Sequence, residues 1–145
     1  MRQFEILGEP KGKGRPRFFR RGNFTGTYTP KETANYENLV RLSYVKEYPG
    51  ESYLEGPLSM SIISFCSIPK SFSKVKQMQA ENNDIHPIKK PDVDNLAKII
   101  ADSLNKIAYE DDKQIVLLSV KKAYARQPKT VVEIKQIRGI NAGGS

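Results

Sequence analysis

The alternation of apolar and polar residues along the chain predicts four strands. Phe4 and Ile6 indicate a short first strand, which Gly8 stops because glycine followed closely by proline favours a turn. The later runs of apolar and β-branched residues are more continuous, as in strands that are buried within a sheet. They predict three strands, over residues 58–68, 115–124 and 130–137.

Spacings of three and four residues predict the helices. Tyr36, Val40 and Tyr44 repeat at this period and indicate one helix that ends near residue 48, just before Pro49. Its start is predicted at Thr29-Pro30, with the threonine hydroxyl as the cap and the proline at the first helical position. Two further helices are predicted, a short one over residues 70–80 and a longer one over residues 92–104.

The remaining segments are rich in glycine, lysine, serine and asparagine, which is typical of loops. The element order β-α-β-(α)-α-β-β favours an α/β (α+β) fold, in which helices pack on a mixed sheet in a single domain. We assign residues 1–140 to that domain. Loops are predicted over residues 11–21 and 82–87, and a flexible tail over residues 141–145.

The charge balance of the chain indicates its class of partner. Its 145 residues suffice for one domain with a proper core. They include 24 Lys and Arg against 16 Asp and Glu, which gives a net charge of +8. This excess favours a polyanionic partner, because cations that bind phosphates gain affinity through counterion release.

Cysteine and histidine are too rare to build several common kinds of site. Cys66 is the only cysteine and lies in an apolar run, so we expect a buried structural thiol rather than a nucleophile. His86 is the only histidine, which excludes a His-rich zinc site. The sequence has no signal-peptide pattern and no apolar segment of membrane-spanning length, so we expect a cytoplasmic protein without a membrane partner.

The acidic residues of this basic chain concentrate between residues 92 and 112. On a helix over residues 92–104, the apolar side chains share one arc, and Asp94, Lys98 and Asp102 line the opposite one. The apolar arc holds Leu96, Ile99, Ile100 and Leu104. Asp92 and Asp94 both lie at the start of this helix, where the helix dipole favours anions.

Asp111 and Asp112 form a second acidic pair, just before the strand that begins at Ile115. A turn at residues 104–108 would allow this pair to meet the start of the preceding helix. On a strand the two side chains would point to opposite faces, so only one should be a principal ligand. Mg²⁺ prefers hard oxygen ligands, usually one or two carboxylates completed by water and phosphate. Together the two pairs indicate a Mg²⁺ site that holds a phosphodiester and activates an attacking water.

A purely structural interpretation of these residues remains open. Asp92 favours a helix cap, and Asp94 could pair with Lys98 four residues later. Lys98 could be a solvated helix lysine, or it could contact a phosphate and stabilise developing negative charge. Asp102 is predicted to form a salt bridge with Lys98.

The chain resembles the RusA family of Holliday junction resolvases, which are often encoded by prophages. The resemblance rests on Lys90-Pro-Asp-Val-Asp-Asn-Leu-Ala-Lys98, Asp102-Ser-Leu and Tyr109-Glu-Asp-Asp-Lys-Gln-Ile-Val116. The segments Gly8-Glu-Pro-Lys-Gly-Lys-Gly-Arg-Pro-Arg-Phe18 and Tyr28-Thr-Pro30 are also similar, so the match covers most of the chain.

This resemblance implies a homodimeric α/β nuclease of DNA recombination and repair. The enzyme would use Mg²⁺, with Mn²⁺ as a substitute, to cut four-way DNA junctions by paired symmetric nicks. It implies that Asp92, Asp94 and Asp112 bind the metal. It further implies that Lys98 is the catalytic lysine and Asp111 a supporting acid. A homodimer suits this substrate, because two nicks related by a two-fold axis call for two identical sites.

The basic segment over residues 11–21 is interleaved with Phe18 and Phe19. It could be a mobile, solvated loop, but beside a nuclease site we expect it to contact the DNA backbone. A nucleotide-binding P-loop is excluded, because the required Gly-Lys-Ser/Thr sequence is missing. The predicted DNA-binding residues are Lys11, Lys13, Arg15, Arg17, Arg20, Arg21, Lys89 and Lys90.

Three functions are compatible with these features. The first is a junction resolvase, and the second is a metal-dependent nuclease acting on flaps, forks or RNA. The third is a nucleic-acid-binding protein without catalytic activity. A cluster of acids would repel phosphate and bring no benefit to a simple binder, so the sequence favours an enzyme. Only the family resemblance separates the first two functions.

Overall fold

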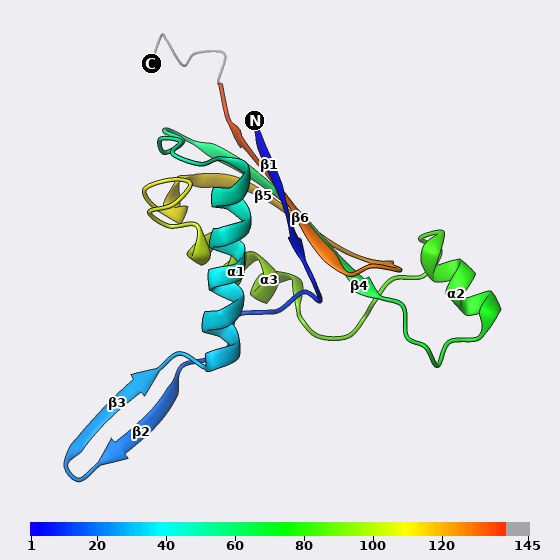
Figure 1. Cartoon of the computed structure of the whole chain (residues 1–145), viewed down its shortest axis with the longest axis horizontal. Coiled ribbons are helices and arrows are strands. Elements are labelled where there is room, and N and C mark those ends of the chain that lie inside the picture. The colour runs from blue at the N-terminus through cyan, green and yellow to red at the C-terminus, as the bar shows by residue number, and fades with distance from the viewer. Residues whose placement is uncertain (139–145) are drawn as a thin grey trace.

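The computed structural model describes residues 1–138, and the predicted tail at residues 141–145 lies outside that range. Figure 1 shows how the elements are arranged. In chain order they are β1 (Arg2–Leu7), β2 (Arg17–Arg21), β3 (Phe24–Tyr28), α1 (Lys31–Glu47), β4 (Leu58–Ser67), α2 (Lys74–Glu81), α3 (Val93–Ser103), the 3₁₀ turn η1 (Asp112–Gln114), β5 (Ile115–Ala125) and β6 (Lys129–Gln136).

The main sheet has four strands in the order β1-β6-β4-β5. The β1–β6 and β6–β4 pairs are antiparallel, whereas β4 and β5 run parallel. The expectation of a mixed sheet is therefore confirmed. β5 follows α3 along the chain and lies at one edge of the sheet, which brings the residues just before β5 close to this helix.

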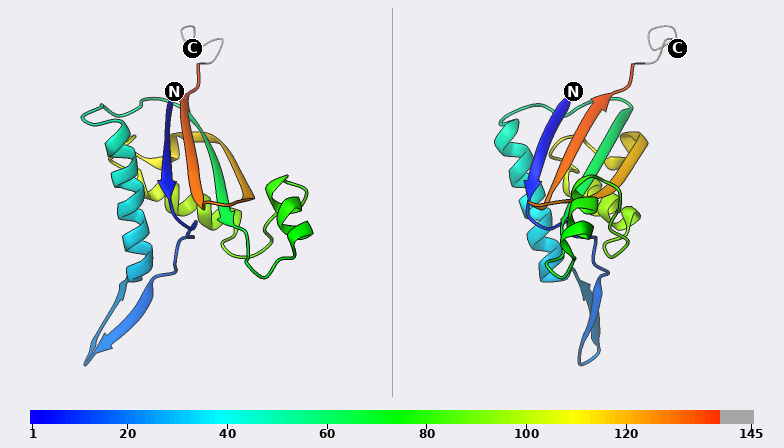
Figure 2. Two further views of the ribbon diagram at one scale, coloured as in Figure 1. Left: turned by 45° about the vertical axis from the view of Figure 1, so that its right-hand side comes forward. Right: turned by 90° about the vertical axis from the view of Figure 1, so that its right-hand side faces the viewer.

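The two longer helices cover one face of this sheet, as Figure 2 shows. Alternate residues of β4 are buried, including Met60 and Ile62, and the residues between them are half-exposed. The buried row belongs to one core cluster with residues of α1 and α3 such as Val40 and Ile99. Helix α1 packs against β1, and α3 packs against both α1 and β5. The fold is thus a single two-layer α+β domain.

Helix α3 has the amphipathic character that its sequence predicts. Leu96, Ile99, Ile100 and Leu104 are all buried, at 1% exposure or less. The opposite side of the helix carries Asp94 and Lys98, which are exposed. Burial of the apolar side fixes the orientation of α3. Its polar stripe, which consists of Asp94, Lys98 and Asp102, is thereby left on the solvent side of the helix.

Three local predictions are corrected by the structure. Residues 17–21, predicted as part of the loop over residues 11–21, form strand β2 of an antiparallel β2–β3 hairpin, which turns at Gly22-Asn23 with a positive φ of 59° at Gly22. A glycine at the first position of a two-residue turn is a hairpin signal that the many arginines obscured. Helix α1 begins at Lys31 after Pro30, and no side chain caps it, so Thr29 is not the cap. Helix α2 begins only at Lys74.

A small satellite cluster lies beside the sheet, around α2. Cys66 is buried there with Ala80 and Tyr124, which confirms the prediction of a buried thiol. Burial is also the main reason why the pKa of this thiol is raised. Within residues 1–138, no helix has both the length and the apolar character needed to cross a membrane.

Candidate active site

The first acidic pair lies at the exposed start of α3. Asp92 is the N-cap residue, and its backbone carbonyl accepts a hydrogen bond from the Leu96 N–H at 3.0 Å. The Asp92 side chain itself makes no capping hydrogen bond. Asp94 lies in the first turn and is likewise exposed. The Asp92 carboxylate is therefore not engaged in capping, contrary to the purely structural interpretation.

Lys98 pairs with an acid at the other end of the helix. Its Nζ lies 3.8 Å from Asp102 Oδ2, which confirms the predicted salt bridge. Among the ion pairs of the described residues, Lys98 has no pairing with Asp94 within 4.0 Å. About 12 Å of helix rise separates the Cα atoms of Asp94 and Asp102, since they are eight residues apart. Lys98 lies between the two acids along the stripe.

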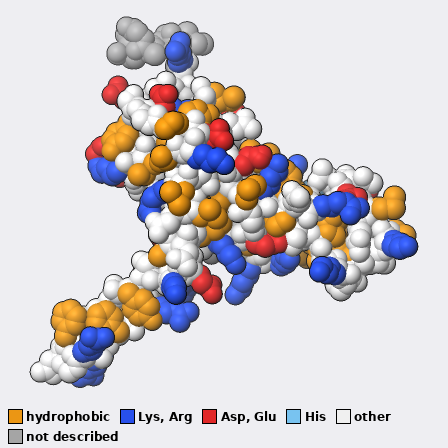
Figure 3. Space-filling view, in the orientation of Figure 1, with side chains coloured by type: hydrophobic (Ala, Val, Ile, Leu, Met, Phe, Trp, Pro, Cys, Tyr) orange, Lys and Arg blue, Asp and Glu red, His pale blue; other side chains and the backbone are white. Residues whose placement is uncertain are grey.

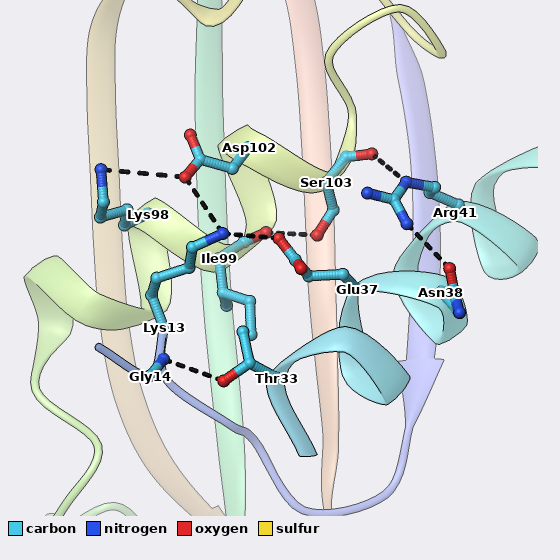
Figure 4. Close-up of polar contacts among 10 residues, drawn as sticks. All are labelled: Lys13, Gly14, Thr33, Glu37, Asn38, Arg41, Lys98, Ile99, Asp102 and Ser103. Atoms are coloured by element: carbon cyan, nitrogen blue, oxygen red, sulfur yellow. Dashed lines mark hydrogen bonds and ion pairs between the residues drawn. The ribbon is translucent and has the colours of Figure 1, made fainter. Parts of the chain in front are cut away.

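Lys13 connects the N-terminal segment to this stripe (Figure 4). Its Nζ lies 2.7 Å from Glu37 Oε2 of α1 and 3.5 Å from Asp102 Oδ2 of α3. Its backbone N–H donates to the Asn95 carbonyl at 3.2 Å. Lys13 was predicted to bind DNA, but its ammonium already faces two carboxylates in the structure.

The second acidic pair lies in a short, heavily hydrogen-bonded loop. Gln114 Oε1 accepts from the backbone N–H groups of Glu110 and Asp111, at 3.1 and 3.2 Å. Its Nε2 donates to the carbonyls of Leu54 and Gly56, both at 3.1 Å. The Asp111 carboxylate in turn accepts from the Lys113 N–H at 2.8 Å. One glutamine thus ties the acidic loop to the segment before β4.

Asp112 lies next to two other carboxylates. Burial raises its pKa first, and the nearby Asp102 and Asp111 raise it further. Its backbone N–H donates to Asn105 Oδ1 at 2.8 Å, which holds it beside the C-terminal end of α3. The buried Tyr109 lies close to the same three acids, and its pKa is raised by burial and by their charges. Crowded carboxylates of this kind favour either a proton or a cation between them.

The structure therefore separates the two predicted acidic pairs. Asp92 and Asp94 lie at the start of α3, whereas Asp112 lies near its end, beside Asp102. Within the described range, no three His, Cys, Asp or Glu side chains are grouped closely enough to hold a metal ion. Asp111 and Asp112 also belong to a 3₁₀ turn and its cap, so the expected alternation along a strand does not apply to them.

Most of the other predicted DNA-binding residues lie around one groove or on the hairpin. The groove has a volume of about 680 Å³ and includes Asp92 in its wall. Its basic wall residues are Lys11, Lys13, Arg15, Arg17 and Lys90. Arg20 and Arg21 lie on β2, and Lys89 precedes α3. The exposed cations along the groove leave a basic path that ends at the N-terminus of α3.

Sequence reasoning assigned no role in the site to Glu37, Asn105 or Gln114, and gave Asp102 only a salt bridge. A signal for Asp102 was present, because Asp94, Lys98 and Asp102 recur every four residues on one helix face. No comparable signal exists for Glu37, whose partner Lys13 is 24 residues away. Contacts of that kind depend on how α1, α3 and the N-terminal segment pack together.

Comparison with known proteins finds relatives that span most of this chain. The family model described as "Endodeoxyribonuclease RusA" matches residues 8–135. The uncharacterized protein YqaN of Bacillus subtilis is 36% identical over 137 residues, which cover 93% of this chain and 96% of YqaN. The crossover junction endodeoxyribonuclease rusA of Lactococcus phage r1t is 30% identical over 112 residues, covering 76% and 77% of the two chains. The chain belongs to the RusA endodeoxyribonuclease family.

Proposed function

We propose that this protein is a divalent-metal-dependent endonuclease that resolves Holliday junctions by paired symmetric nicks. The observation that carries the proposal is that both acidic motifs fall inside the RusA match, with Asp94 exposed at the start of α3 and Asp112 beside Asp102 near its C-terminal end. The crossover-junction activity named for the phage relative is consistent with it.

We keep Asp92, Asp94 and Asp112 as the proposed metal ligands, with Asp111 in support, although Asp92 and Asp94 lie at the start of α3 and Asp112 lies near its end. The chemistry of these donors fits Mg²⁺, for which Mn²⁺ can substitute, because all are hard carboxylate oxygens. The raised pKa of Asp112 supports a cation in this region, since a positive charge would relieve its repulsion from Asp102 and Asp111. A bound divalent ion supplies charge neutralisation at the phosphate and acidifies the attacking water.

The position of Asp102 introduces an alternative ligand set. It lies closer to Asp112 than the helix-start acids do, as its effect on the pKa of Asp112 indicates. Asp102 is, however, already balanced by Lys13 at 3.5 Å and Lys98 at 3.8 Å. We therefore assign Asp102 the task of positioning Lys98, and keep Asp94 and Asp112 as the principal acids of our proposal.

Lys98 is proposed to act directly on the phosphodiester. Its side chain is 62% exposed and lies on the same stripe as Asp94. The Asp102 carboxylate restrains the lysine from one side, so the ammonium can face a phosphate held above the helix. There it would stabilise the negative charge that develops on the oxygens of the scissile phosphate.

Strand β5 offers a surface for the homodimer that paired nicking requires. Val116, Leu117 and Leu118 are 64%, 61% and 46% exposed, on a strand at the edge of the sheet. Edge strands with exposed apolar side chains are prone to pair with another chain. A second copy bound here would bring its own acidic loop close by, because Asp112 lies four residues before Val116.

A cleavage assay on defined DNA structures tests the proposal. The substrates are a synthetic four-way junction, a linear duplex and a flap, each with Mg²⁺, Mn²⁺ or EDTA. We expect symmetric nicks in the junction that require metal and are lost in Asp94→Asn, Asp112→Asn and Lys98→Ala. Asp84→Asn, an exposed acid in the loop before α3, is the matched control and should retain full activity.

The same assay separates the competing functions. Metal-dependent cleavage of flaps or RNA with an intact junction would indicate a nuclease of different specificity. Binding to all substrates without cleavage under any metal condition would indicate a nucleic-acid-binding protein without catalytic activity. Either outcome would overturn the proposal.

A further inference from the structure

The β2–β3 hairpin projects from the body of the protein as a separate arm, visible in both views of Figure 2. Every residue of its two strands is exposed or half-buried. Its register runs from Arg17 opposite Tyr28 to Arg21 opposite Phe24, and the principal contacts of each strand are with the other. A two-stranded hairpin of this kind is only marginally stable in water, so an exposed one is a candidate for binding a partner.

One face of this arm carries a row of aromatic rings. The Phe19 ring lies 5.9 Å from that of Phe24 and 6.3 Å from that of Tyr28, measured between centroids. Gly26 pairs with Phe19, and a Cβ at this glycine would come within 2.7 Å of the Phe19 ring. The glycine therefore allows the central ring to lie flat across the hairpin. Figure 3 shows hydrophobic side chains in a line along the arm.

Several aromatic rings of the arm remain at least half exposed. Phe18 is 84% exposed on the other face of β2, and Phe24 is 64% exposed next to the turn. Tyr28 is 50% exposed. Leaving several aromatic rings in water is unfavourable, and contacts to phosphate groups would not require them. Their placement indicates a partner with flat apolar surfaces.

The charge of the arm restricts the partner further. Between residues 10 and 31 the chain has seven Lys and Arg residues and no Asp or Glu. Arg17 and Arg21 share the aromatic face, and Arg20 lies beside Phe18 on the other face. This charge attracts a polyanion and disfavours a second copy of the same arm. Single-stranded nucleic acid combines a polyanionic backbone with flat ring surfaces, which basic grooves and aromatic side chains bind together.

We infer that the hairpin is a base-stacking arm for unpaired nucleotides at a DNA branch point. Phe18 and Phe24 would stack on exposed bases, and the neighbouring arginines would bind the flanking phosphates. Fully paired duplex hides its bases, so the arm would discriminate branched or gapped DNA from intact duplex. This inference rests on the proposed function for the choice of branched DNA as substrate.

Equilibrium binding in EDTA, which prevents cleavage, tests the arm separately from the nuclease site. The probes are a four-way junction and a gapped duplex, each with 2-aminopurine at the unpaired or branch position, and an intact duplex. The double variant Phe18→Ala/Phe24→Ala should bind the first two about tenfold more weakly, a typical effect of losing base stacking. It should bind intact duplex as the wild type does, and the fluorescence change of 2-aminopurine should disappear.

Conservative variants guard against trivial unfolding of the hairpin. Phe18→Trp should preserve binding, whereas Phe18→Leu, which is apolar but not flat, should weaken it as Phe18→Ala does. Val75→Ala, which shortens an exposed apolar residue of α2, is the matched control and should change nothing. Arg17→Gln should lower the salt dependence for all probes without affecting the fluorescence signal.

Three outcomes would overturn the inference. They are unchanged binding in the double variant, equal loss for intact duplex, or a shift to monomer in sedimentation, which would show that the arm holds a second copy. Failure of the proposed function is distinguishable, because it appears as absent cleavage with wild-type protein. Selective loss of gapped-DNA binding in the arm variants would still support the arm.

Discussion

The Nζ of Lys13 lies 2.7 Å from Oε2 of Glu37, and the two side chains are only 22% and 11% exposed. This ion pair joins the N-terminal basic segment to α1, and the contact of the same ammonium with Asp102 extends it to α3. A lysine in a segment that composition marks as a solvated loop therefore serves as a structural connection. Through Asp102, Lys13 contacts the polar side of α3 that also carries the proposed catalytic Lys98.

Replacing this lysine should destabilise the protein. In Lys13→Met the Glu37 carboxylate loses its partner while remaining largely buried, which costs about 2 kcal/mol in the free energy of unfolding. Urea denaturation measures this change. Lys11→Met is the control, because Lys11 is exposed and belongs to the same segment. Equal stability of the two variants would contradict a structural role for Lys13.

The glutamine beneath the acidic loop should matter for both stability and activity. Gln114→Ala removes hydrogen bonds to four backbone groups, and we expect a loss of about 2 kcal/mol. Gln114→Glu should be worse, because its carboxylate would face the carbonyls of Leu54 and Gly56. Hydrogen exchange of residues 109–115 should rise in both variants, and nuclease activity should fall. Gln79→Ala, at an exposed position on α2, provides the comparison and should leave exchange unchanged.

The crowded acids predict how stability depends on pH when no divalent ion is present. The pKa of Asp112 is raised in the folded state, so the folded protein binds more protons than the unfolded chain between the two pKa values. Protonated Asp112 therefore adds to the free energy of unfolding at low pH. This contribution is lost as the pH rises through the pKa that Asp112 has in the folded protein. Asp112→Asn should remove this decline and raise the free energy of unfolding at neutral pH. Thermal unfolding in EDTA across pH 3–8 tests it, and a steeper decline in the variant would refute the assignment.

Gly14 should tolerate no side chain. A Cβ at this position would lie 2.4 Å from Thr33 Oγ1 and 3.3 Å from Pro30 Cγ. Gly14→Ala should therefore cost about 1–3 kcal/mol, as overpacking does. In Gly14→Ala/Thr33→Ala the clashing oxygen is gone, so the double variant should be more stable than the sum of the single effects predicts. Strict additivity in chemical denaturation would argue against this close approach.

Much of the fold follows from patterns that are local in the sequence. The apolar spacing of Leu96, Ile99 and Ile100 was sufficient to predict which face of α3 is buried. The later strands were predicted to within a few residues, because their apolar runs are long and bounded by prolines and polar loops. The hairpin was missed because its aromatic residues alternate with arginines, so composition obscured a period-two pattern and a Gly-Asn turn.

Some features of the candidate site also follow from local sequence patterns, whereas others depend on tertiary packing. By itself the sequence determined the acidic motifs, the amphipathic helix that presents them and the family to which they belong, since each depends on neighbouring residues. Only the tertiary structure decided that Asp112 lies with Asp102 rather than with Asp94, and that Lys13 pairs with Glu37. These partners are brought together by the packing of α1, α3 and the N-terminal segment. Such distances depend on where each turn ends and how closely the helices approach, which residue spacing does not encode.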